Sequence, residues 1–82
     1  EEEEEYDEDE QDWIIFPNPA TTVINSSELN VKYKIYDLSG KLVLNGVSFN
    51  GAIHIDSLEE GNYLIQLENA AGETSKKSFI KL

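Results

Sequence analysis

Few side chains in this sequence could do chemistry. It holds one His, His54, and no Cys, so His54 has no second His or Cys to help it as a metal ligand or proton-relay partner. Enzymes also use paired carboxylates in a cleft or a metal with an open position, and no such convergent set is recognisable. We therefore predict no catalytic residue, no metal site and no cofactor, and we expect His54 to be a partly exposed strand residue.

The segment DSLEEG, residues 56–61, comes nearest to a ligand site. It resembles the start of a calcium loop, in which oxygen ligands recur at alternate positions and a Gly permits a sharp turn. Leu58 stands at the third position, where an oxygen donor is required, so we expect no calcium site. The tripeptide NSS, residues 25–27, fits the N-glycosylation pattern, which is short and often matches by chance.

The acidity of the chain belongs mainly to its first twelve residues. Ten of the 17 Asp and Glu residues lie in EEEEEYDEDEQD, and residues 13–82 hold the other seven together with all six Lys. A segment with so much like charge and so little apolar surface cannot bury a core, so we expect residues 1–12 to be an extended, disordered acidic linker. Because there is no basic surface to displace counterions from phosphates, we expect no nucleic-acid partner.

No transmembrane or leader segment is recognisable. The longest apolar run is WIIF at residues 13–16, far shorter than the ~20 residues that a bilayer helix needs. The chain begins with Glu and lacks a basic stretch followed by an apolar one. We therefore expect no secretory signal peptide here, and a sequence that is part of a longer protein.

Apolar and polar residues alternate over most of residues 13–82. From Val31 to Ile35 the odd-numbered residues are apolar or aromatic and the even-numbered ones are Lys, which predicts a half-buried strand. Similar short runs occupy residues 13–16, 22–25, 41–44, 52–55, 62–68 and 75–82. No segment keeps a helical period for the length of an amphipathic helix, so we expect no helix.

Turn signals separate these runs: PNP, SSELN, DLSG, EEGN, NAAG and two NG pairs. Such regular spacing predicts an all-β fold, a small immunoglobulin-like antiparallel β-sandwich of about seven strands over residues 13–82. Asn45-Gly46 and Asn50-Gly51 each favour a two-residue hairpin turn. Since both cannot close long hairpins, we expect one hairpin within residues 44–56 and leave its register open.

Three of the turn motifs have a purely structural explanation. Asp37 can accept hydrogen bonds from nearby amides, and Gly40 can take the left-handed conformation of a bulged hairpin loop. Leu58 and Tyr63 are expected core residues on either side of a turn that has Gly61 at positive φ. The two prolines of FPNP favour an extended crossing from one sheet to the other.

Taken in order, the motifs resemble a known family. The segments FPNPATTVIN (16–25), VKYKIYDLSGKLVL (31–44), IDSLEEGNYLIQL (55–67) and SKKSFIKL (75–82) are similar to the type A C-terminal sorting domain of the type IX secretion system of the Bacteroidetes. The similarity covers nearly all of residues 14–82. Each motif alone is weak, but four in this order and spacing make a specific signal.

The resemblance implies a non-catalytic signal domain fused to the C-terminus of a larger cargo. Such domains fold in the periplasm and direct the cargo through the outer membrane, so that it is secreted or held on the cell surface of a Gram-negative bacterium. The implied partners are the type IX translocon, an outer-membrane β-barrel shuttle protein and a sortase that cleaves upstream of the domain. The candidate recognition residues, from the family pattern and its final motif, are Pro17, Asn18, Pro19, Asp37, Gly40, Lys41, Leu58, Gly61, Tyr63, Lys76, Lys77, Phe79, Ile80, Lys81 and Leu82.

Some positions depart from the family pattern. Phe16 stands where the family often has Tyr, and Glu59-Glu60 replaces a more usual Pro-Ser type pair, which adds negative charge beside a candidate recognition loop. The acidic residues 1–12 are not part of the pattern, and we expect a sortase to cut there because self-repulsion keeps the linker accessible. The tripeptide DSL resembles an O-glycosylation motif of the Bacteroidetes, so Ser57 is a candidate glycan acceptor.

Two interpretations of the last motif, KKSFIKL, stay open. At a sheet edge its backbone could pair with a strand of a partner, or of a second copy in a homodimer, with Phe79 or Ile80 filling a pocket. Alternatively, the strand only closes the sandwich and its lysines protect the edge from aggregation. If the domain is a sorting signal, we expect removal of residues 79–82 to leave a largely folded domain that no longer exports its cargo.

A different class of function is an immunoglobulin-like accessory module that spaces domains or binds carbohydrate. Carbohydrate binding needs an exposed aromatic platform, for which the candidates are Trp13, Tyr33, Tyr36 and Phe49. In a domain this small we expect most of these aromatic side chains to be part of the core.

Overall fold

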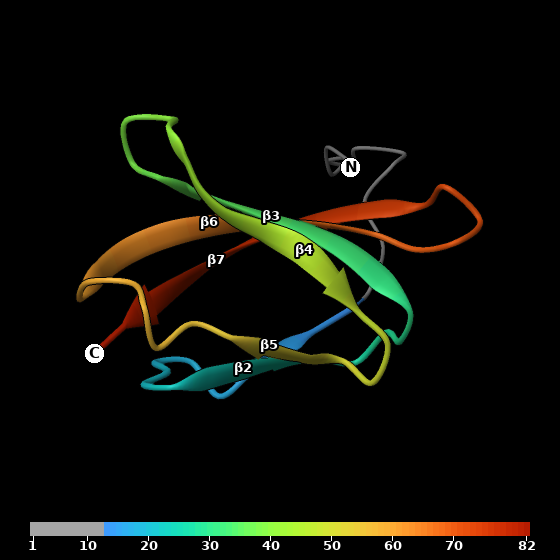
Figure 1. Ribbon diagram of the computed structural model, residues 1–82, viewed down its shortest axis with the longest axis horizontal. Coiled ribbons are helices and arrows are strands. Elements are labelled where there is room, and N and C mark those ends of the chain that lie inside the picture. Colours follow the sequence, from blue (N-terminus) through green and yellow to red (C-terminus); the bar gives the residue numbers. More distant parts are fainter. Residues whose placement is uncertain (1–12) are drawn as a thin grey trace, which may run out of the picture.

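The computed structural model describes residues 13–82, which form two antiparallel sheets packed face to face (Figure 1). The seven strands are β1 (Ile15–Phe16), β2 (Val23–Ser26), β3 (Val31–Asp37), β4 (Leu42–Ser48), β5 (Ala52–His54), β6 (Gly61–Glu68) and β7 (Thr74–Lys81). The three-stranded sheet has the order β1-β2-β5 and the four-stranded sheet the order β4-β3-β6-β7. The predicted seven-stranded β-sandwich is confirmed. The acidic linker predicted for residues 1–12 lies outside the described residues.

Strand β3 shows how the alternation of residue types becomes a two-sided sheet. Val31 and Ile35 are completely buried, whereas Lys32 and Lys34 are exposed. Ile35 lies opposite Leu44 on β4 and is flanked on its other side by β6. Since successive side chains of a strand point to opposite faces, one face of the four-stranded sheet packs on the smaller sheet and the other is solvated.

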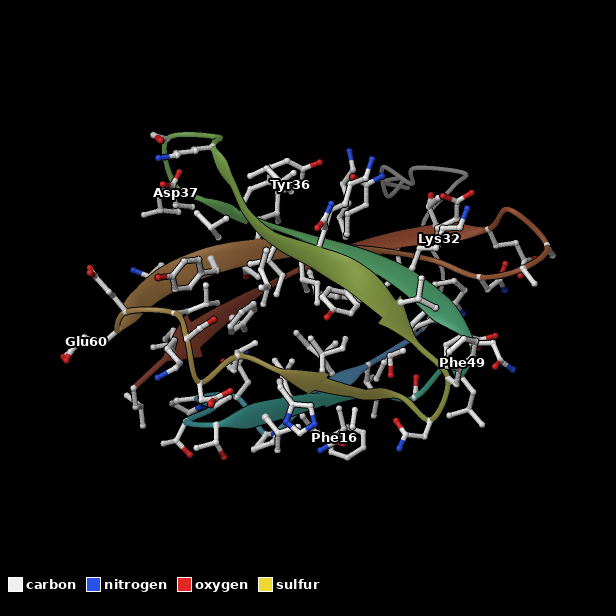
Figure 2. All side chains as sticks on the ribbon, in the orientation of Figure 1. Phe16, Lys32, Tyr36, Asp37, Phe49 and Glu60 are labelled. Carbon is white, nitrogen blue, oxygen red and sulfur yellow. The ribbon has the colours of Figure 1, made fainter. Side chains whose placement is uncertain are left out.

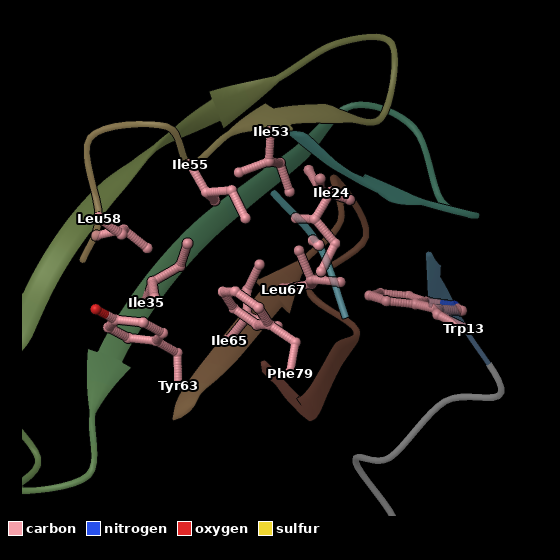
Figure 3. Close-up of a cluster of buried hydrophobic side chains, with 12 residues drawn as sticks. Trp13, Ile24, Ile35, Ile53, Ile55, Leu58, Tyr63, Ile65, Leu67 and Phe79 are labelled. Carbon is pink, nitrogen blue, oxygen red and sulfur yellow. The ribbon is translucent and has the colours of Figure 1, made fainter. Parts of the chain in front are cut away.

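The core lies between the two sheets (Figure 3). Ile24, Ile35, Ile65 and Phe79, from four different strands, are among its completely buried side chains. Trp13 packs at one end of the cluster, and Leu58 and Tyr63 pack at the other. Burying such side chains stabilises the fold by about 1.5–3 kcal/mol each, so β2, β3, β6 and β7 are held mainly by the residues they bury.

The segment from residue 44 to residue 56 differs from its prediction. Asn45-Gly46 is no turn, because Gly46 lies inside β4, where a Cβ would be 2.7 Å from the Tyr33 hydroxyl. The Gly gives room for a tyrosine ring rather than for a reversal of the chain. Asn50-Gly51 does form a turn, with φ +88° at Gly51, but it connects β4 to β5, which belong to different sheets. The expected hairpin is therefore wrong, since this turn joins the two layers.

The loop between β3 and β4 is built around one carboxylate. Asp37 Oδ1 accepts hydrogen bonds from the Ser39 and Lys41 amides, both at 3.0 Å, and the Asp37 N–H donates to the Lys41 carbonyl at 3.0 Å. Gly40 has φ +90°, in the left-handed region that Gly enters without steric cost. The predicted bulged loop is confirmed.

The loop between β6 and β7 repeats this geometry with an amide in place of the carboxylate. Asn69 Oδ1 accepts from the Ala71 and Glu73 amides at 3.0 Å, and the Asn69 N–H donates to the Glu73 carbonyl at 3.0 Å. Gly72 has φ +87°. The chain therefore uses one loop design twice, at opposite ends of the sandwich (Figure 1).

The FPNP segment leads from β1 in the smaller sheet to the edge of β7 in the larger one. Ala20, which follows it, forms a parallel bridge with Lys81. The crossing between sheets is as predicted, but the segment is bent rather than extended at residues 17–19, and the peptide bonds before Pro17 and Pro19 are both cis.

Candidate functional site

Four segments that carry the candidate recognition residues meet at one end of the sandwich, which we call the motif end. They are residues 17–20, 37–41, 57–63 and 78–82. In the strand ladders Asp37 lies opposite Tyr63, and Lys81 lies opposite Gly61 and bridges to Ala20. Figure 1 shows the β3–β4 loop, the connection into β6 and the C-terminal end of β7 on the same side of the molecule. Motifs up to 62 residues apart in sequence thus share one end of the fold.

Asn18 joins the first motif to the last. Its Oδ1 accepts a hydrogen bond from the Ile80 N–H at 3.0 Å, and its Nδ2 donates to the Ser78 carbonyl at 3.3 Å. The Ala20 N–H donates to the Ile80 carbonyl at 2.9 Å, and the Leu82 N–H donates to the Ala20 carbonyl at 2.8 Å. We call these four hydrogen bonds the Asn18 clamp. An amide side chain that both donates and accepts takes the place of part of a neighbouring strand.

The clamp decides how much of the edge of β7 is open. Over residues 78–82 the outward backbone groups are bonded to Asn18 and Ala20, so this part is closed to strand addition in the folded domain. Phe79 is 1% exposed and stacks on Tyr63 with ring centroids 5.6 Å apart. Phe79 therefore fills the core of its own domain rather than a pocket of a partner, and Ile80, 44% exposed, is the apolar residue of this motif that faces solvent.

The three lysines of β7 lie in different surroundings. Lys76 is exposed, Lys77 is half-buried, and Lys81 is buried. The Lys81 ammonium donates to the Leu82 carbonyl at 2.9 Å, which supplies an acceptor that a buried charge requires. Of these three side chains, that of Lys76 is the one most accessible to a partner.

The carboxylate of Asp37 is held in its charged form by the loop that it stabilises. The Ser39 hydroxyl donates to Asp37 Oδ1 at 2.6 Å, besides the two amide donors. These hydrogen bonds, first that of the Ser39 hydroxyl and then that of the Lys41 amide, lower the pKa of Asp37 below its ordinary value of 3.8, because they favour the charged form. Gly40 and Lys41 are exposed in the same loop.

Tyr63 ties the connection between β5 and β6 to the core. Its ring is buried, and its hydroxyl donates to the Glu59 carbonyl at 2.6 Å. A tyrosine near the start of a strand that bonds back to the chain just before it is the tyrosine corner of immunoglobulin-like sandwiches. Leu58 is buried beside it, and Gly61 has φ +153°. The predicted core positions of Leu58 and Tyr63 and the positive φ of Gly61 are confirmed.

Two hollows flank Tyr63 at the motif end. The first, of about 340 Å³, is lined by Asn18, Leu38, Asn62, Tyr63, Ser78, Phe79 and Ile80. The second, of about 380 Å³, is lined by Asp37, Lys41, Val43, Ser57, Leu58, Glu59 and Tyr63. Some candidate residues, such as Leu58, Tyr63 and Phe79, are buried and form the inner walls of these hollows. Others, such as Ser57, are exposed at the rims.

Leu38 is an exposed residue of the motif end that the motif alone did not single out. It is 77% exposed, although an apolar side chain at a loop tip gains nothing from contact with water. The equivalent position of the Asn69 loop holds the smaller Ala70. A large apolar residue at the second position of an Asp-x-x-Gly loop is the signal that could have identified it.

The aromatic candidates for carbohydrate binding lie in different places: Trp13 and Tyr33 pack in or against the core, whereas Tyr36 lies beside Asp37 on β3. Figure 2 shows Asp37 and Glu60 at the motif end and Phe49 at the opposite end. Phe49 is 74% exposed, whereas Trp13 is buried and Tyr33 and Tyr36 are half-buried. Of these four candidates only Phe49 is exposed, so they do not form a shared carbohydrate-binding platform.

His54 lies on β5 with an exposed side chain. Within residues 13–82 no group of three or more His, Asp or Glu is placed to hold a metal ion. The same part of the chain contains no helix long and apolar enough to cross a membrane.

The described chain starts at the end of the sandwich opposite to the motif end. The Ile14 N–H donates to Ser27 Oγ at 2.9 Å and the Ser27 N–H donates to the Ile14 carbonyl at 2.9 Å, so the chain enters β1 beside the connection from β2 to β3. The Asn69 loop lies at this end too, with Asn69 Nδ2 donating to the Glu28 carboxylate at 3.4 Å. A polypeptide that precedes Trp13 is therefore attached away from the motif end.

Comparison with known proteins identifies a family for this chain. Residues 14–81 match the family described as the secretion system C-terminal sorting domain. The chain is 33% identical over 67 residues to beta-agarase D of Zobellia galactanivorans, a match that covers 80% of this chain and 14% of that protein.

A solved structure of PorZ, described as an essential bacterial surface component of the type IX secretion system of Porphyromonas gingivalis, shares the fold. The TM-score is 0.66 at 15% identity, over 87% of this chain and 11% of that one. The chain thus spans only a small part of either protein, as a terminal module does. It belongs to the family of secretion system C-terminal sorting domains, non-catalytic signals fused to the C-terminus of a larger cargo and recognised by the type IX machinery, which delivers that cargo to the surface or surroundings of a Bacteroidetes cell.

Proposed function

We propose that the motif end is the surface that the type IX machinery reads, and that an outer-membrane β-barrel shuttle protein receives the domain there. The observation that carries this proposal is the meeting of four motif segments at one end of the sandwich while the preceding chain joins at the other. A receptor that binds the motif end does not have to displace the cargo.

The proposed contact is apolar at its centre and charged at its rim. Leu38 and Ile80 are 77% and 44% exposed beside the 340 Å³ hollow, and exposed apolar groups around a hollow are typical of protein-binding surfaces. Lys41 and Glu59 line the neighbouring hollow. Because the Asn18 clamp already fixes the backbone of Ile80, little ordering of this segment is needed on binding.

The test is export of a fluorescent protein that carries residues 1–82 at its C-terminus, in a Bacteroidetes host with a working type IX system. The double variant Leu38→Asp, Ile80→Asp places charge at the motif end without touching the core. Its matched control, Leu29→Asp with Phe49→Asp, changes residues that are 53% and 74% exposed and lie away from the motif end. We expect the first variant to be retained in the periplasm and the control to be exported. Normal export of a folded first variant would contradict the proposal.

The two equivalent loops allow recognition and stability to be tested separately. Asp37→Ala and Asn69→Ala each remove the acceptor of a loop with the same hydrogen-bond geometry, so both should lower the melting temperature. If export depends only on folding, both variants should lose it to a similar degree. We expect export to fail for Asp37→Ala alone, since only that loop lies at the motif end.

We further propose that a sortase cuts within the acidic residues 1–12. The composition supports this, because ten acidic residues in twelve are expected to bury too little apolar surface for a packed core. Trp13, which follows, is buried. Mass spectrometry of the domain left after export should find its new N-terminus at or before Trp13. A cut inside β1 would refute this proposal, because it would remove a strand from the smaller sheet.

Ser57 is our proposed O-glycan acceptor. Its side chain is exposed in the turn after β5 and stands at the rim of the 380 Å³ hollow, where an attached sugar would not disturb the core. The intact mass of the domain isolated from its native host should exceed the peptide mass, and the Ser57→Ala variant should return to it. An unshifted mass in the unmodified sequence would rule the site out.

A further inference from the structure

Strand β4 is the open edge of this sandwich. The four-stranded sheet ends with β7 on one side and with β4 on the other. The end of β7 is covered by the Asn18 clamp, while β1 and β5 are only 2 and 3 residues long. β4 has 7 residues, and within residues 13–82 its backbone hydrogen bonds go to β3 alone. One long strand edge is therefore left without a neighbour in the described domain.

The register identifies the backbone groups that point outward from this edge. Asp37 donates its N–H to the carbonyl just before β4, so the odd-numbered residues of β3 are the ones that bond to β4. Tyr33 is paired with Gly46. Asn45 and Val47, on either side of Gly46, therefore direct their N–H and C=O groups away from the sheet.

The usual protection of an edge strand is missing over this stretch. Natural sheets guard their edges with Lys, Pro, bulges or very short strands. Residues 42–50, LVLNGVSFN, hold no charged residue and no Pro, and the register shift between Ile35 and Tyr36 affects only the start of β4. From residue 44 to residue 48 the edge is regular, uncharged and suited to strand addition.

We propose that β4 pairs with β4 of a second copy, antiparallel, about a two-fold axis at Gly46. In this register Asn45 of each copy lies opposite Val47 of the other, and each of these two pairs can exchange both of its backbone hydrogen bonds. A two-fold interface needs a patch that complements itself, and an uncharged strand with Gly at the axis does so. Pairing through β7 would instead bring Lys76 and Lys77 of the two copies together.

The charge of the chain gives this dimer a distinctive salt dependence. Each copy carries a formal charge of −11, so two copies repel each other, while the β4 contact is made by backbone and uncharged side chains. Added salt shortens the range of the repulsion to about 8 Å at physiological ionic strength. The dimer should therefore strengthen as salt is raised, whereas a dimer held by ion pairs would weaken.

The experiment is sedimentation equilibrium of residues 1–82 at low and high salt, with hydrogen exchange of the backbone amides at low and high protein concentration. We expect a monomer–dimer equilibrium favoured by salt, and slower exchange at Asn45 and Val47 at the higher concentration. Val47→Lys, at a 52% exposed position, should raise the dissociation constant at least tenfold. Leu64→Lys, 38% exposed on the central strand β6, is the matched control and should leave it unchanged.

Val47→Pro gives a second test, since it removes an outward N–H that takes no part in the ladder with β3 and Pro is tolerated on edge strands. It should abolish the dimer while circular dichroism stays that of the folded domain. A chain that remains monomeric at every concentration and salt, or a dimer that both Val47 variants leave intact, would overturn the inference. Neither result bears on recognition at the motif end, which the export variants test separately.

Discussion

At the scale of single residues, the motif segments contain two kinds of side chain: buried ones that hold the motif end together, and exposed ones that a partner could contact. Leu58, Tyr63 and Phe79 are at most 9% exposed, so substitution of any of them changes the fold before it changes a contact. Leu38 and Ile80 are displayed beside the apolar hollow. A motif position can thus be essential to export for either reason, and the two kinds of residue need different tests.

The hydroxyl of Tyr63 permits a clean test of one building contact. Tyr63→Phe keeps the stacking on Phe79 but removes the 2.6 Å hydrogen bond to the Glu59 carbonyl. We expect a loss of about 1 kcal/mol in the free energy of unfolding, seen as a fall of roughly 4–8 °C in melting temperature. An unchanged melting temperature would mean that this tyrosine corner contributes nothing to stability.

Asp37 predicts a dependence of stability on acid. Its pKa is below the ordinary 3.8 in the folded chain, so its charged form stabilises the fold at neutral pH, and this contribution is lost as the pH falls through the lowered pKa. Asp37→Asn keeps the acceptor oxygen, as Asn69 does in the equivalent loop, but cannot titrate. Melting curves of the two proteins should differ at pH 7 and converge in acid. A difference that stays constant with pH would contradict this.

At the scale of elements, the repeated loop and the clamp fix how the strands end. The Asp37 and Asn69 loops follow the same pattern, which is readable from the sequence because in each the acceptor comes shortly before a Gly. The clamp was not readable, because Asn18 bonds to residues 60 and 62 positions away and no local pattern encodes such a pairing. The turn predicted at Asn45-Gly46 is wrong for a similar reason, since the Tyr33 ring that occupies the space beside Gly46 comes from another strand.

The two loops make a quantitative prediction about Gly. A Cβ added at Gly40 or Gly72 would meet no atom within 4 Å beyond the adjoining residues, and the φ angles are +90° and +87°, so Ala is disfavoured by backbone conformation alone. Gly40→Ala and Gly72→Ala should therefore each cost about 1–2 kcal/mol. Urea denaturation of both variants measures this. Costs that differ by more than about 1 kcal/mol would show that the loops are not energetically equivalent.

The clamp predicts where the backbone of β7 opens first. Asn18→Ala removes the acceptor of the Ile80 N–H and the donor to the Ser78 carbonyl. We expect the Ile80 amide to exchange about fivefold faster, the equivalent of about 1 kcal/mol, while amides of β3 are unaffected. Equal acceleration throughout the sheet would instead indicate a global loss of stability.

At the scale of the whole molecule, the domain has a small core, and its last strand is part of it. Removing residues 79–82 deletes Phe79, 1% exposed, and the bonds that Ile80 and Leu82 make with residues 18 and 20. Loss of a buried Phe side chain alone costs roughly 3–5 kcal/mol, about what the core of so small a domain supplies. The expectation of a largely folded truncated domain does not fit this packing.

We therefore predict that the chain ending at residue 78 is unfolded. Fluorescence of the buried Trp13 and far-UV circular dichroism of the isolated chain, with and without residues 79–82, measure this directly. A cooperative melting transition in the shortened chain would show that the part of β7 before Phe79 suffices to close the sandwich.

The overall architecture could be predicted from the sequence because each strand has its own alternation of apolar and polar residues. The motif end could not be predicted, because its residues come from different strands and loops. In β3 and β6 the alternating apolar residues, such as Val31 and Ile65, are the ones that are buried. The motif end exists only once residues 18, 38, 63 and 80 have been brought together. The family resemblance supplied the list of residues, and the fold separates those that are buried from those that are exposed.

The Asn18 clamp has a consequence for quality control during export. Because residues near the start of the domain bond directly to residues at its end, the sandwich can close only when the entire domain has been synthesised and has crossed into the compartment where it folds. A polypeptide that was cut short or stalled in transit would present no completed motif end. On the proposed recognition at the motif end, the contact that stabilises the last strand would also make export depend on the arrival of the final residues of the domain.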